Sequence, residues 1–363
     1  MEEEEFNICY KCSNNEALQE EIIKMGQKID QCDFCDNKNL PGLNQDTIED
    51  IKPYLEAYVA YYYPQADWDR RYGNRNYLDT IYEEELFFNW KKIEQNDKYD
   101  LLYYSIENEN SETLILEDHW ASPWALVNQE HHRLLNSLTS EDNFKNKLEA
   151  TTELINQAEL MLKNKTVEIS GYRSRIGCKK VPGEYGRNVN APYDKKDIGV
   201  APKDAISSGR ANRAFCGFLY LSEDIDTSVL EVRAQKGDLV SIGEFHSKSP
   251  LRIFDLTDPD IWKFKENYST VTELELISAI NSLFSKPIGN GTNSIYLDTQ
   301  LIVEEIIRKN YDGICFRSSF TGNKNYTLFN SDLMEEQSGK GKLFKVDKIE
   351  LTLSEDNDDL WNV

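Results

Sequence analysis

The chain has 363 residues, of which 64 are Asp or Glu and 41 are Lys or Arg, so its formal net charge is −23. Hydrophobic residues make up 39% of the sequence, enough to bury the cores of two or three domains. Most of the acidity lies in residues 1–165, which carry 34 acidic and 16 basic side chains. A surface of that charge repels phosphates, so direct nucleic-acid binding is not expected.

The sequence predicts neither export nor membrane insertion. It begins MEEEEF, the opposite of the basic start of a signal peptide, and no apolar run approaches the ~20 residues of a membrane helix. Seven cysteines are too few for a disulfide scaffold in a chain of this length. We therefore expect a cytoplasmic protein with reduced thiols and no membrane partner.

Two CxxC pairs stand near the N-terminus, Cys9 with Cys12 and Cys32 with Cys35. Each pair can hold one edge of a metal ion, and together they complete the tetrahedral four-cysteine shell of structural zinc. Such a shell leaves no open position, so the metal would have no catalytic role. A redox CxxC pair is the main alternative, although no thioredoxin-like strand–helix–strand pattern surrounds either pair. Residues 1–42 are therefore predicted to form a zinc knuckle with Zn²⁺ as its cofactor.

Residues 43–165 are predicted to be mainly helical. A first run of helical spacing starts at Leu43, with Asp46 or Thr47 as its expected N-cap. The clearest helical period extends from Glu141 to Asn164 and predicts one buried stripe. This stripe comprises Phe144, Leu148, Thr151, Ile155, Ala158 and Leu162.

Residues 166–363 alternate strand-like runs, turns and helices, which predicts a mixed domain and an α+β fold class for the whole chain. Strands are expected at 218–222, 238–245, 251–256, 311–319 and 326–330, and helices at 271–284 and 299–309. The stretch from Tyr172 to Arg213 carries ten basic and four acidic side chains in an otherwise acidic protein. Such a cluster either holds an anionic ligand or balances the acidic first half across an interface.

Several short motifs follow one another in this third segment in a specific order. They read GYRSR at 171–175, SGRANRAFCGFLYLS at 208–222, SVLEVR at 228–233, LRIFDLT at 251–257, YLDTQLIVEEI at 296–306, YDGICFRSS at 311–319 and NYTLFN at 325–330. In this order they resemble the RES domain, a family named for its Arg, Glu and Ser residues, over residues 168–335. The resemblance implies an ADP-ribosyltransferase-like fold and a toxin that consumes NAD⁺ or transfers its ADP-ribose. It also implies an antitoxin, Xre-like in many members, that covers the active site.

The resemblance carries site residues over one position at a time. Arg173 and Arg175 match the YR motif, Arg210 and Asn212 the GR-x-N motif, Tyr220 the LYLS strand, Glu231 the EVR motif, and Ser318 or Ser319 the serine after DGI. Two departures affect the expected pocket wall. The N-P-x-G that usually follows the GR motif is stretched to residues 212–217, and Phe316 stands where Tyr is common.

The chemistry of NAD⁺ cleavage suits these residue types. NAD⁺ joins an anionic pyrophosphate to a cationic nicotinamide, whose departure passes through an oxocarbenium-like sugar. We expect Arg173 and Arg210 to hold the pyrophosphate in the reactive geometry. Glu231 is expected to stabilise the positive charge on the sugar, and Tyr220 to offer a flat face to the nicotinamide ring. Ser318 is expected to hydrogen-bond the nicotinamide amide or a phosphate.

The predicted function is an NAD⁺-degrading toxin or immune effector, acting as a glycohydrolase or a phosphorylase. A transferase that places ADP-ribose on a protein or nucleic acid is the first alternative, and a catalytically silent nucleotide- or partner-binding module is the second. The helical segment resembles the HEPN-like domains that precede some RES domains. Its run His131-His132-Arg133 reverses the order of the HEPN nuclease motif. We therefore expect it to regulate the enzyme, and we expect the chain to form a homodimer.

Overall fold

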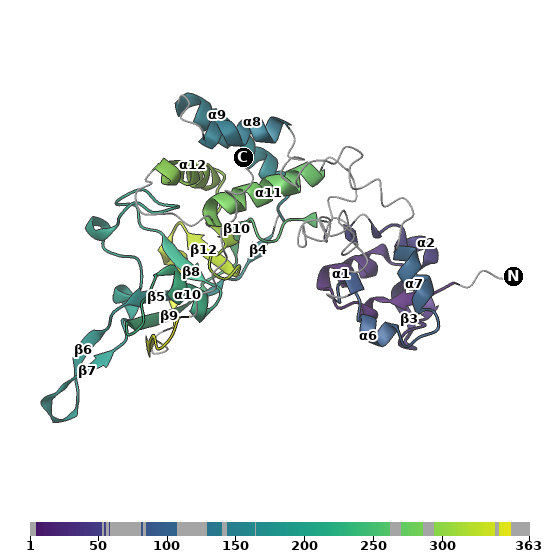
Figure 1. The fold of residues 1–363 in the computed structure, drawn as a ribbon, viewed down its shortest axis with the longest axis horizontal. Helices are drawn as coiled ribbons and strands as arrows, with labels where there is room; N and C mark the ends of the chain where they lie inside the picture. Colours follow the sequence, from purple (N-terminus) through teal and green to yellow (C-terminus); the bar gives the residue numbers. More distant parts are fainter. Residues whose placement is uncertain are drawn as a thin grey trace, which may run out of the picture. The chain divides into compact units, whose positions relative to one another are not determined.

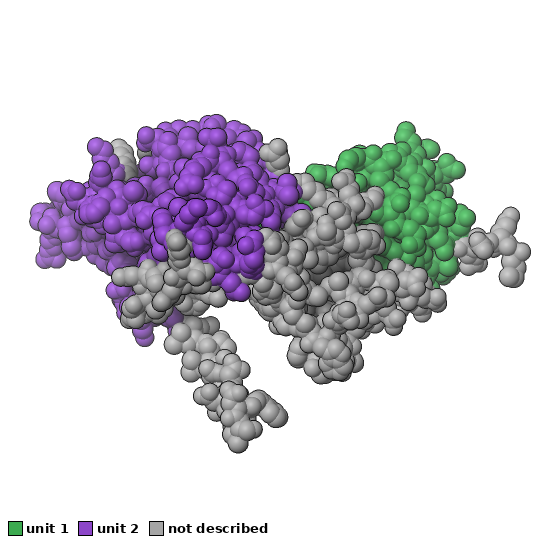
Figure 2. Space-filling view, turned by 90° about the horizontal axis from the view of Figure 1, so that it is seen from above, with its two compact units in different colours: residues 1–132, 260–276 green, residues 133–259, 277–363 purple. Residues whose placement is uncertain are grey.

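The computed structural model describes residues 5–52, 54–55, 58, 81–82, 85–106, 129–139, 144–163, 165–261, 270–285, 294–337 and 341–349. The chain divides into two compact units, which are coloured separately in Figure 2. The first comprises residues 1–132 and 260–276, and the second residues 133–259 and 277–363. Within the described ranges, no helix is both long and apolar enough to cross a membrane.

The first unit combines a three-stranded sheet with short helices. Its strands β1 (Asn7–Cys9), β2 (Lys28–Gln31) and β3 (Lys38–Asn44) pair antiparallel in the order β1-β3-β2. Its helices are α1 (Glu16–Met25), α2 (Gln45–Ile48), α6 (Trp90–Ile93) and α7 (Tyr99–Ile106), with a 3-10 turn at Tyr10–Cys12. Trp90 is buried and packs edge-on against the rings of Phe88, Tyr99 and Tyr103. An aromatic core of this kind gives the small unit a large apolar contact area.

The helix expected from Leu43 begins later and is capped by a different residue. Leu43 lies in β3, and α2 starts at Gln45 with Asn44 as its N-cap. Asn44 Oδ1 accepts a hydrogen bond from Thr47 N at 3.0 Å, and Thr47 Oγ1 accepts one from Asn44 N at 2.9 Å. The two residues thus form a capping box, with Thr47 at its third helical position. The prediction of Asp46 or Thr47 as the cap was wrong.

The second unit is built on one large mixed sheet with the strand order β13-β9-β5-β8-β12-β11-β10-β4, and β14 pairs with β9 (Figure 1). The strands are β4 (Thr166–Val167), β5 (Ser170–Ile176), β8 (Leu219–Ser222), β9 (Leu239–Ser247), β10 (Leu251–Asp255), β11 (Gly313–Arg317), β12 (Lys324–Leu328), β13 (Met334–Glu336) and β14 (Lys342–Lys345). Strands β6 (Lys179–Pro182) and β7 (Asn188–Ala191) form a separate hairpin. With the helices, this sheet makes the α+β fold that the sequence predicts, and all five expected strands are confirmed.

The helices of this unit are α9 (Phe144–Leu160), α10 (Ile225–Glu231) and α12 (Ser294–Arg308), while α8 (Gln129–Thr139) and α11 (Thr270–Ser285) contribute residues to both units. Helices α11 and α12 confirm the two helices expected in this part of the chain. Helix α9 packs on α12, although it lies within residues 43–165, the predicted helical segment. Its predicted start at Glu141 lies outside the described residues. Four of the six residues of the predicted stripe are buried, namely Thr151, Ile155, Ala158 and Leu162. Phe144 is 51% exposed and Lys147 is buried in its place, so the prediction was wrong at the start of the helix.

Glu159 joins α9 to the end of α12 and to the sheet. Its carboxylate accepts hydrogen bonds from Lys309 Nζ at 2.6 Å and Tyr311 OH at 2.9 Å, and it pairs with Arg252 at 3.2 Å. The Arg252 guanidinium in turn lies 4.0 Å from the centroid of the Tyr311 ring. Burial alone would raise the pKa of Glu159, but the hydrogen bonds and positive charges of these partners lower it below its usual value.

The lowered pKa of Glu159 makes the stability of the second unit depend on pH. Because the unfolded carboxyl binds its proton more tightly, the stabilisation is complete above the unfolded pKa of 4.5 and is lost as the pH falls through the folded value. We expect Glu159→Gln to lower the free energy of unfolding by about 2 kcal/mol at neutral pH and to remove this acid dependence. Denaturant unfolding above and below pH 4.5 measures both effects. Glu153→Gln, at an exposed position of α9, is the control, and equal losses in both variants would contradict the assignment.

Candidate functional site

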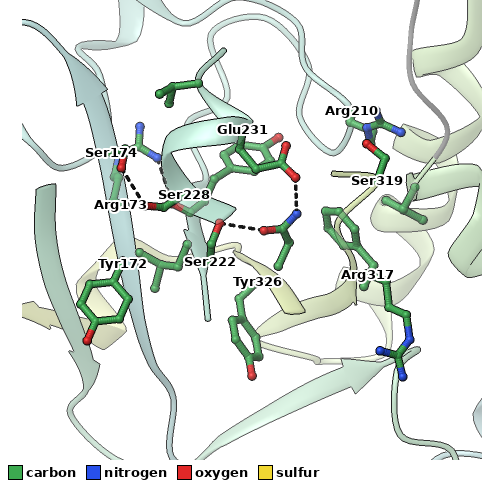
Figure 3. A pocket seen from close by; sticks show the side chains of 16 residues that line it. Tyr172, Arg173, Ser174, Arg210, Ser222, Ser228, Glu231, Arg317, Ser319 and Tyr326 are labelled. Atoms are coloured by element: carbon green, nitrogen blue, oxygen red, sulfur yellow. Dashed lines mark hydrogen bonds between the residues drawn. The ribbon is translucent and has the colours of Figure 1, made fainter. Parts of the chain in front are cut away.

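A cavity of about 290 Å³ lies where strands β5 and β8 separate. Among the described residues these two strands pair at a single position, Tyr172 opposite Ser222. The end of α10, α11 and the strands β11 and β12 complete the walls (Figure 3). Of the residues carried over from the sequence, Arg173, Arg210, Tyr220, Glu231 and Ser319 line it.

Glu231 is the last residue of α10, and hydrogen bonds fix one of its two carboxylate oxygens. Its Oε1 accepts from Ser318 Oγ at 2.7 Å and from Asn325 Nδ2 at 2.6 Å. Asn325 is itself held, because its Oδ1 accepts from Ser222 Oγ at 2.7 Å (Figure 3). Both Asn325 and Ser222 are buried. The Oε2 atom of Glu231 has no hydrogen bond to any described residue, so it is available to a ligand in the cavity.

Two arginines at the cavity, Arg173 and Arg210, make few hydrogen bonds through their guanidinium groups. Arg173 Nη1 donates to Tyr220 O at 3.1 Å, while its Nε is buried and lacks a hydrogen-bond partner among the described residues. Arg210 Nη1 makes only a long hydrogen bond, 3.4 Å, to Leu283 O. Burial lowers the pKa of both guanidinium groups, because desolvation disfavours their charge. An anionic ligand would compensate this burial and satisfy the Nε of Arg173.

Tyr220 and Asn212 hold the loop that carries Arg210. Tyr220 OH donates to Asn212 Oδ1 at 2.7 Å and accepts from Ala211 N at 3.3 Å, and burial raises the pKa of Tyr220 to about 12. Asn212 Nδ2 donates to two backbone carbonyls of the same loop. A Cβ at Gly209 would lie 2.5 Å from Asn212 Oδ1, so this turn requires glycine. The side chain of Asn212 therefore braces the loop and does not line the cavity.

Arg175 follows Arg173 by two residues on β5, but the structure does not bring it to the cavity. Its side chain is exposed, and its guanidinium lies 5.0 Å from the centroid of the Tyr193 ring. Its Nη1 donates to Asp197 O at 2.5 Å. These contacts fasten β5 to the segment after the β6–β7 hairpin, on the outside of the domain.

The two candidate serines have different surroundings. Ser318 is buried and donates to Glu231, whereas the exposed Ser319 lines the cavity. Asn325 and Ser222 were not among the predicted site residues, although both lie in the motifs at 325–330 and 208–222. Asn325 is paired with Ser222 in the register of β12 and β8, so both side chains lie on the same face of the sheet. Strand alternation from Tyr220 was the signal that could have identified them.

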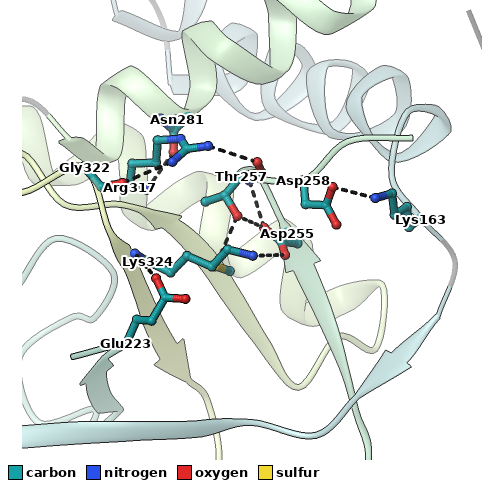
Figure 4. Close-up of polar contacts among 10 residues, drawn as sticks. Lys163, Glu223, Asp255, Thr257, Asp258, Asn281, Arg317, Gly322 and Lys324 are labelled. Carbon is teal, nitrogen blue, oxygen red and sulfur yellow. Dashed lines mark hydrogen bonds and ion pairs between the residues drawn. The ribbon is translucent and has the colours of Figure 1, made fainter. Parts of the chain in front are cut away.

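A second polar cluster, on the opposite face of the sheet, is satisfied within itself (Figure 4). Lys324 lies 3.7 Å from Asp255, which also accepts hydrogen bonds from Thr257 N and Oγ1. The Arg317 guanidinium donates to two backbone carbonyls here, although the residue also lines the cavity. Burial raises the pKa of the neighbouring Cys315 thiol well above its usual value, so this thiol is not a nucleophile. This cluster therefore stabilises the sheet.

The four cysteines of the two CxxC pairs meet in the first unit. Their sulfurs all lie within 4.8 Å of one another, with Cys9 and Cys35 at 3.4 Å and Cys12 and Cys32 at 3.7 Å. Zinc with bonds of ~2.3 Å in a tetrahedral shell holds its sulfurs ~3.8 Å apart, so the cluster has the right size. Cys9 N donates to Cys32 Sγ, and Asn37 Nδ2 donates to Cys35 Sγ, contacts that favour thiolate ligands. These residues fit a structural Zn²⁺ ion.

A comparison with protein families matches residues 181–351 to the RES domain. The chain carries a RES domain. The matched stretch includes Arg210, Tyr220, Glu231 and Ser318, whereas β5 with Arg173 precedes it. The RES domain therefore accounts for most of the second unit, and α9 lies before it in the sequence.

A chain in the crystal structure of the M. tuberculosis MbcT–MbcA toxin–antitoxin complex is similar to this chain. The two are 11% identical, with a TM-score of 0.28, and the match covers 53% of this chain and 89% of the other. The comparison with curated proteins found no match.

Proposed function

We propose that the RES domain cleaves the bond between nicotinamide and ribose in NAD⁺, and that the chain acts as a toxin or immune effector by depleting this nucleotide. The arrangement of Glu231, Arg173 and Arg210 around one cavity carries the proposal. It offers the second carboxylate oxygen of Glu231 and the Nε of Arg173, which lacks a partner among the described residues, beside Arg210, whose hydrogen bond to Leu283 O is long at 3.4 Å. NAD⁺ presents the complementary charges, a pyrophosphate and a sugar that becomes positive during cleavage.

In this proposal the pyrophosphate lies against Arg173 and Arg210, where the buried Nε of Arg173 gains a partner. Oε2 of Glu231 faces the ribose and stabilises the charge at C1′ as the C1′–N bond breaks. The bonding electrons stay on nicotinamide, which leaves as a neutral molecule and needs no general acid. Water then bonds to C1′ and releases one proton to bulk solvent, which gives ADP-ribose. If phosphate reacts instead, an anionic oxygen of the dianion bonds to C1′ and no proton needs to leave. At about 290 Å³ the cavity is slightly smaller than the ~300–1,000 Å³ typical of ligand pockets, so the adenosine lies outside it.

The products distinguish the reactions that this site could perform. Nicotinamide and ADP-ribose formed without phosphate indicate a glycohydrolase, and release that requires phosphate indicates a phosphorylase. Release that requires a protein or nucleic-acid acceptor, with the label of adenine-labelled NAD⁺ in the macromolecule, indicates an ADP-ribosyltransferase. A chain that binds NAD⁺ and releases nothing under any of these conditions is a silent binding module, which would refute the proposal.

Arg210→Ala is expected to weaken NAD⁺ binding at least about tenfold, since a charge-assisted hydrogen bond contributes ~1.5–3 kcal/mol. Calorimetric titration measures this loss, with Glu231→Gln present in every variant so that the ligand is not consumed. Arg175→Ala is the matched control, because Arg175 lies on the same domain away from the cavity. Equal affinities of the two variants would remove Arg210 from the site.

The first unit supplies structure and regulation in this proposal. Its four cysteines bind one Zn²⁺ ion, which stabilises the unit and takes no part in catalysis. The resemblance to RES toxins also implies an antitoxin that covers the cavity and a homodimeric enzyme. Light scattering measures the mass of the purified chain, alone and with proteins that co-purify with it. It therefore tests both the homodimer and the complex with an antitoxin. A mass of one chain with no bound protein would contradict both expectations.

A further inference from the structure

One turn of α12 connects α9 to the loop of residues 207–213, which carries Arg210. The turn consists of Asp298, Thr299 and Gln300, three consecutive residues. Asp298 contacts α9, and the other two contact the loop. Both Thr299 and Gln300 are buried, so water does not compete for these contacts.

On the α9 side, the contact is a buried ion pair. Lys147 Nζ lies 3.0 Å from Asp298 Oδ1, and the two side chains are 9% and 15% exposed. The same ammonium group donates to Leu138 O of α8, the helix in which the sequence passes from the first unit to the second. Removing one partner of such a pair leaves an uncompensated buried charge, so α9 and α12 are strongly tied at this point.

On the loop side, two side chains hold the backbone around Arg210. Thr299 Oγ1 donates to Arg210 O. Gln300 Nε2 lies 2.8 Å from Gly209 O and 2.9 Å from Asn212 O, and it also reaches Ser208 Oγ at 2.8 Å. The carbonyls on both sides of Arg210 are therefore fixed by one amide group of α12.

We propose that Lys147 and Gln300 are positioning residues, through which α9 holds Arg210 at the cavity. Helix α9 lies before the RES match at residues 181–351, so a segment outside the recognised domain completes its active site. The positioning itself does not depend on the reaction. Its effect on NAD⁺ rests on the proposed function.

Hydrogen–deuterium exchange of the whole chain tests the proposal without any assay of activity. We expect Lys147→Met and Gln300→Leu each to speed amide exchange in residues 207–217 at least about tenfold. Gln300→Leu removes hydrogen bonds to the loop directly, whereas Lys147→Met leaves Asp298 without its cation and loosens the turn of α12 that carries Thr299 and Gln300. Exchange in β9 should not change. Lys147→Arg should preserve the slow exchange, and Lys145→Met, at a 78% exposed position of α9, is the matched control. If Lys147→Met does not fold, Asp298→Asn takes its place.

Nicotinamide release gives the second readout. If the proposed function holds, Lys147→Met and Gln300→Leu raise the KM for NAD⁺ more than they lower kcat, since Glu231 stays in place and Arg210 does not. Unchanged loop exchange in Lys147→Met would overturn the role of α9, and unchanged exchange in Gln300→Leu would overturn the role of Gln300. Equal acceleration throughout the second unit would overturn both. If the variants exchange faster in the loop but the wild-type chain does not cleave NAD⁺, the positioning role of Lys147 and Gln300 is supported and the proposed function is refuted.

Discussion

Glu231→Gln is expected to lower nicotinamide release at least about 10²-fold while the fold stays intact. The carboxamide keeps an oxygen that can accept from Ser318 and Asn325, so the local hydrogen bonds survive. What the variant loses is the negative charge that stabilises the oxocarbenium-like sugar. Removing a single stabilising contact from a preorganised site typically costs 10²–10³ in kcat. The rate of nicotinamide release at saturating NAD⁺ measures the effect.

Asp226→Asn is the matched control, because Asp226 is an exposed carboxylate on the same helix. This control should release nicotinamide at the wild-type rate. Thermal unfolding of both variants shows whether either one has lost its fold. A Glu231→Gln variant with wild-type activity would exclude Glu231 from catalysis.

Cys12→Ser is expected to abolish zinc binding and to unfold the first unit. A structural zinc ion contributes ~10–16 kcal/mol of apparent binding free energy in zinc-finger peptides, which exceeds the stability of a small domain. Strand β1 ends at Cys9 and β2 ends one residue before Cys32, so both strands lead into the cysteine cluster, in which Cys12 is buried. Metal analysis should find about one zinc per wild-type chain, and near-ultraviolet circular dichroism of the Trp90 cluster should report the loss of packing.

Cys216→Ser is the control for this experiment, since Cys216 is an exposed cysteine outside the cluster. It should retain both the zinc and the aromatic signal. Treatment of the wild-type chain with a strong chelator should reproduce the Cys12→Ser spectrum. A metal-free chain with a fully packed first unit would refute the zinc site.

Local sequence patterns predicted five strands and two helices of the second unit, and motif order predicted five of the residues that line the cavity. The strand at 219–222 follows from the LYLS motif, and the RES resemblance predicts that Arg173, Arg210 and Glu231 contact one ligand, as their positions around one cavity allow. The CxxC spacing likewise identified four cysteines that meet in space. Such features depend on neighbours in the chain or on motif order, which the sequence displays directly.

The features that the sequence did not predict depend on hydrogen bonds and ion pairs between residues far apart in the chain. The periodicity of α9 predicts that Phe144 is buried, but Lys147 is buried instead. Its charge is compensated by Asp298, which lies 151 residues further along the chain. Asn325 reaches Glu231 across 94 positions, and Gln300 reaches Gly209 across 91. A polar side chain is buried only where such a partner satisfies it, and no local pattern predicts that partner.

Nicotinamide release from NAD⁺ by the whole chain is the measurement that tests NAD⁺ cleavage most directly. The reaction contains phosphate and a cell lysate as a source of acceptors, so that hydrolysis, phosphorolysis and transfer are all permitted. The predicted result is release by the wild-type chain that falls at least about 10²-fold in Glu231→Gln. Intact NAD⁺ in the presence of a folded wild-type chain that binds it would contradict cleavage at this site.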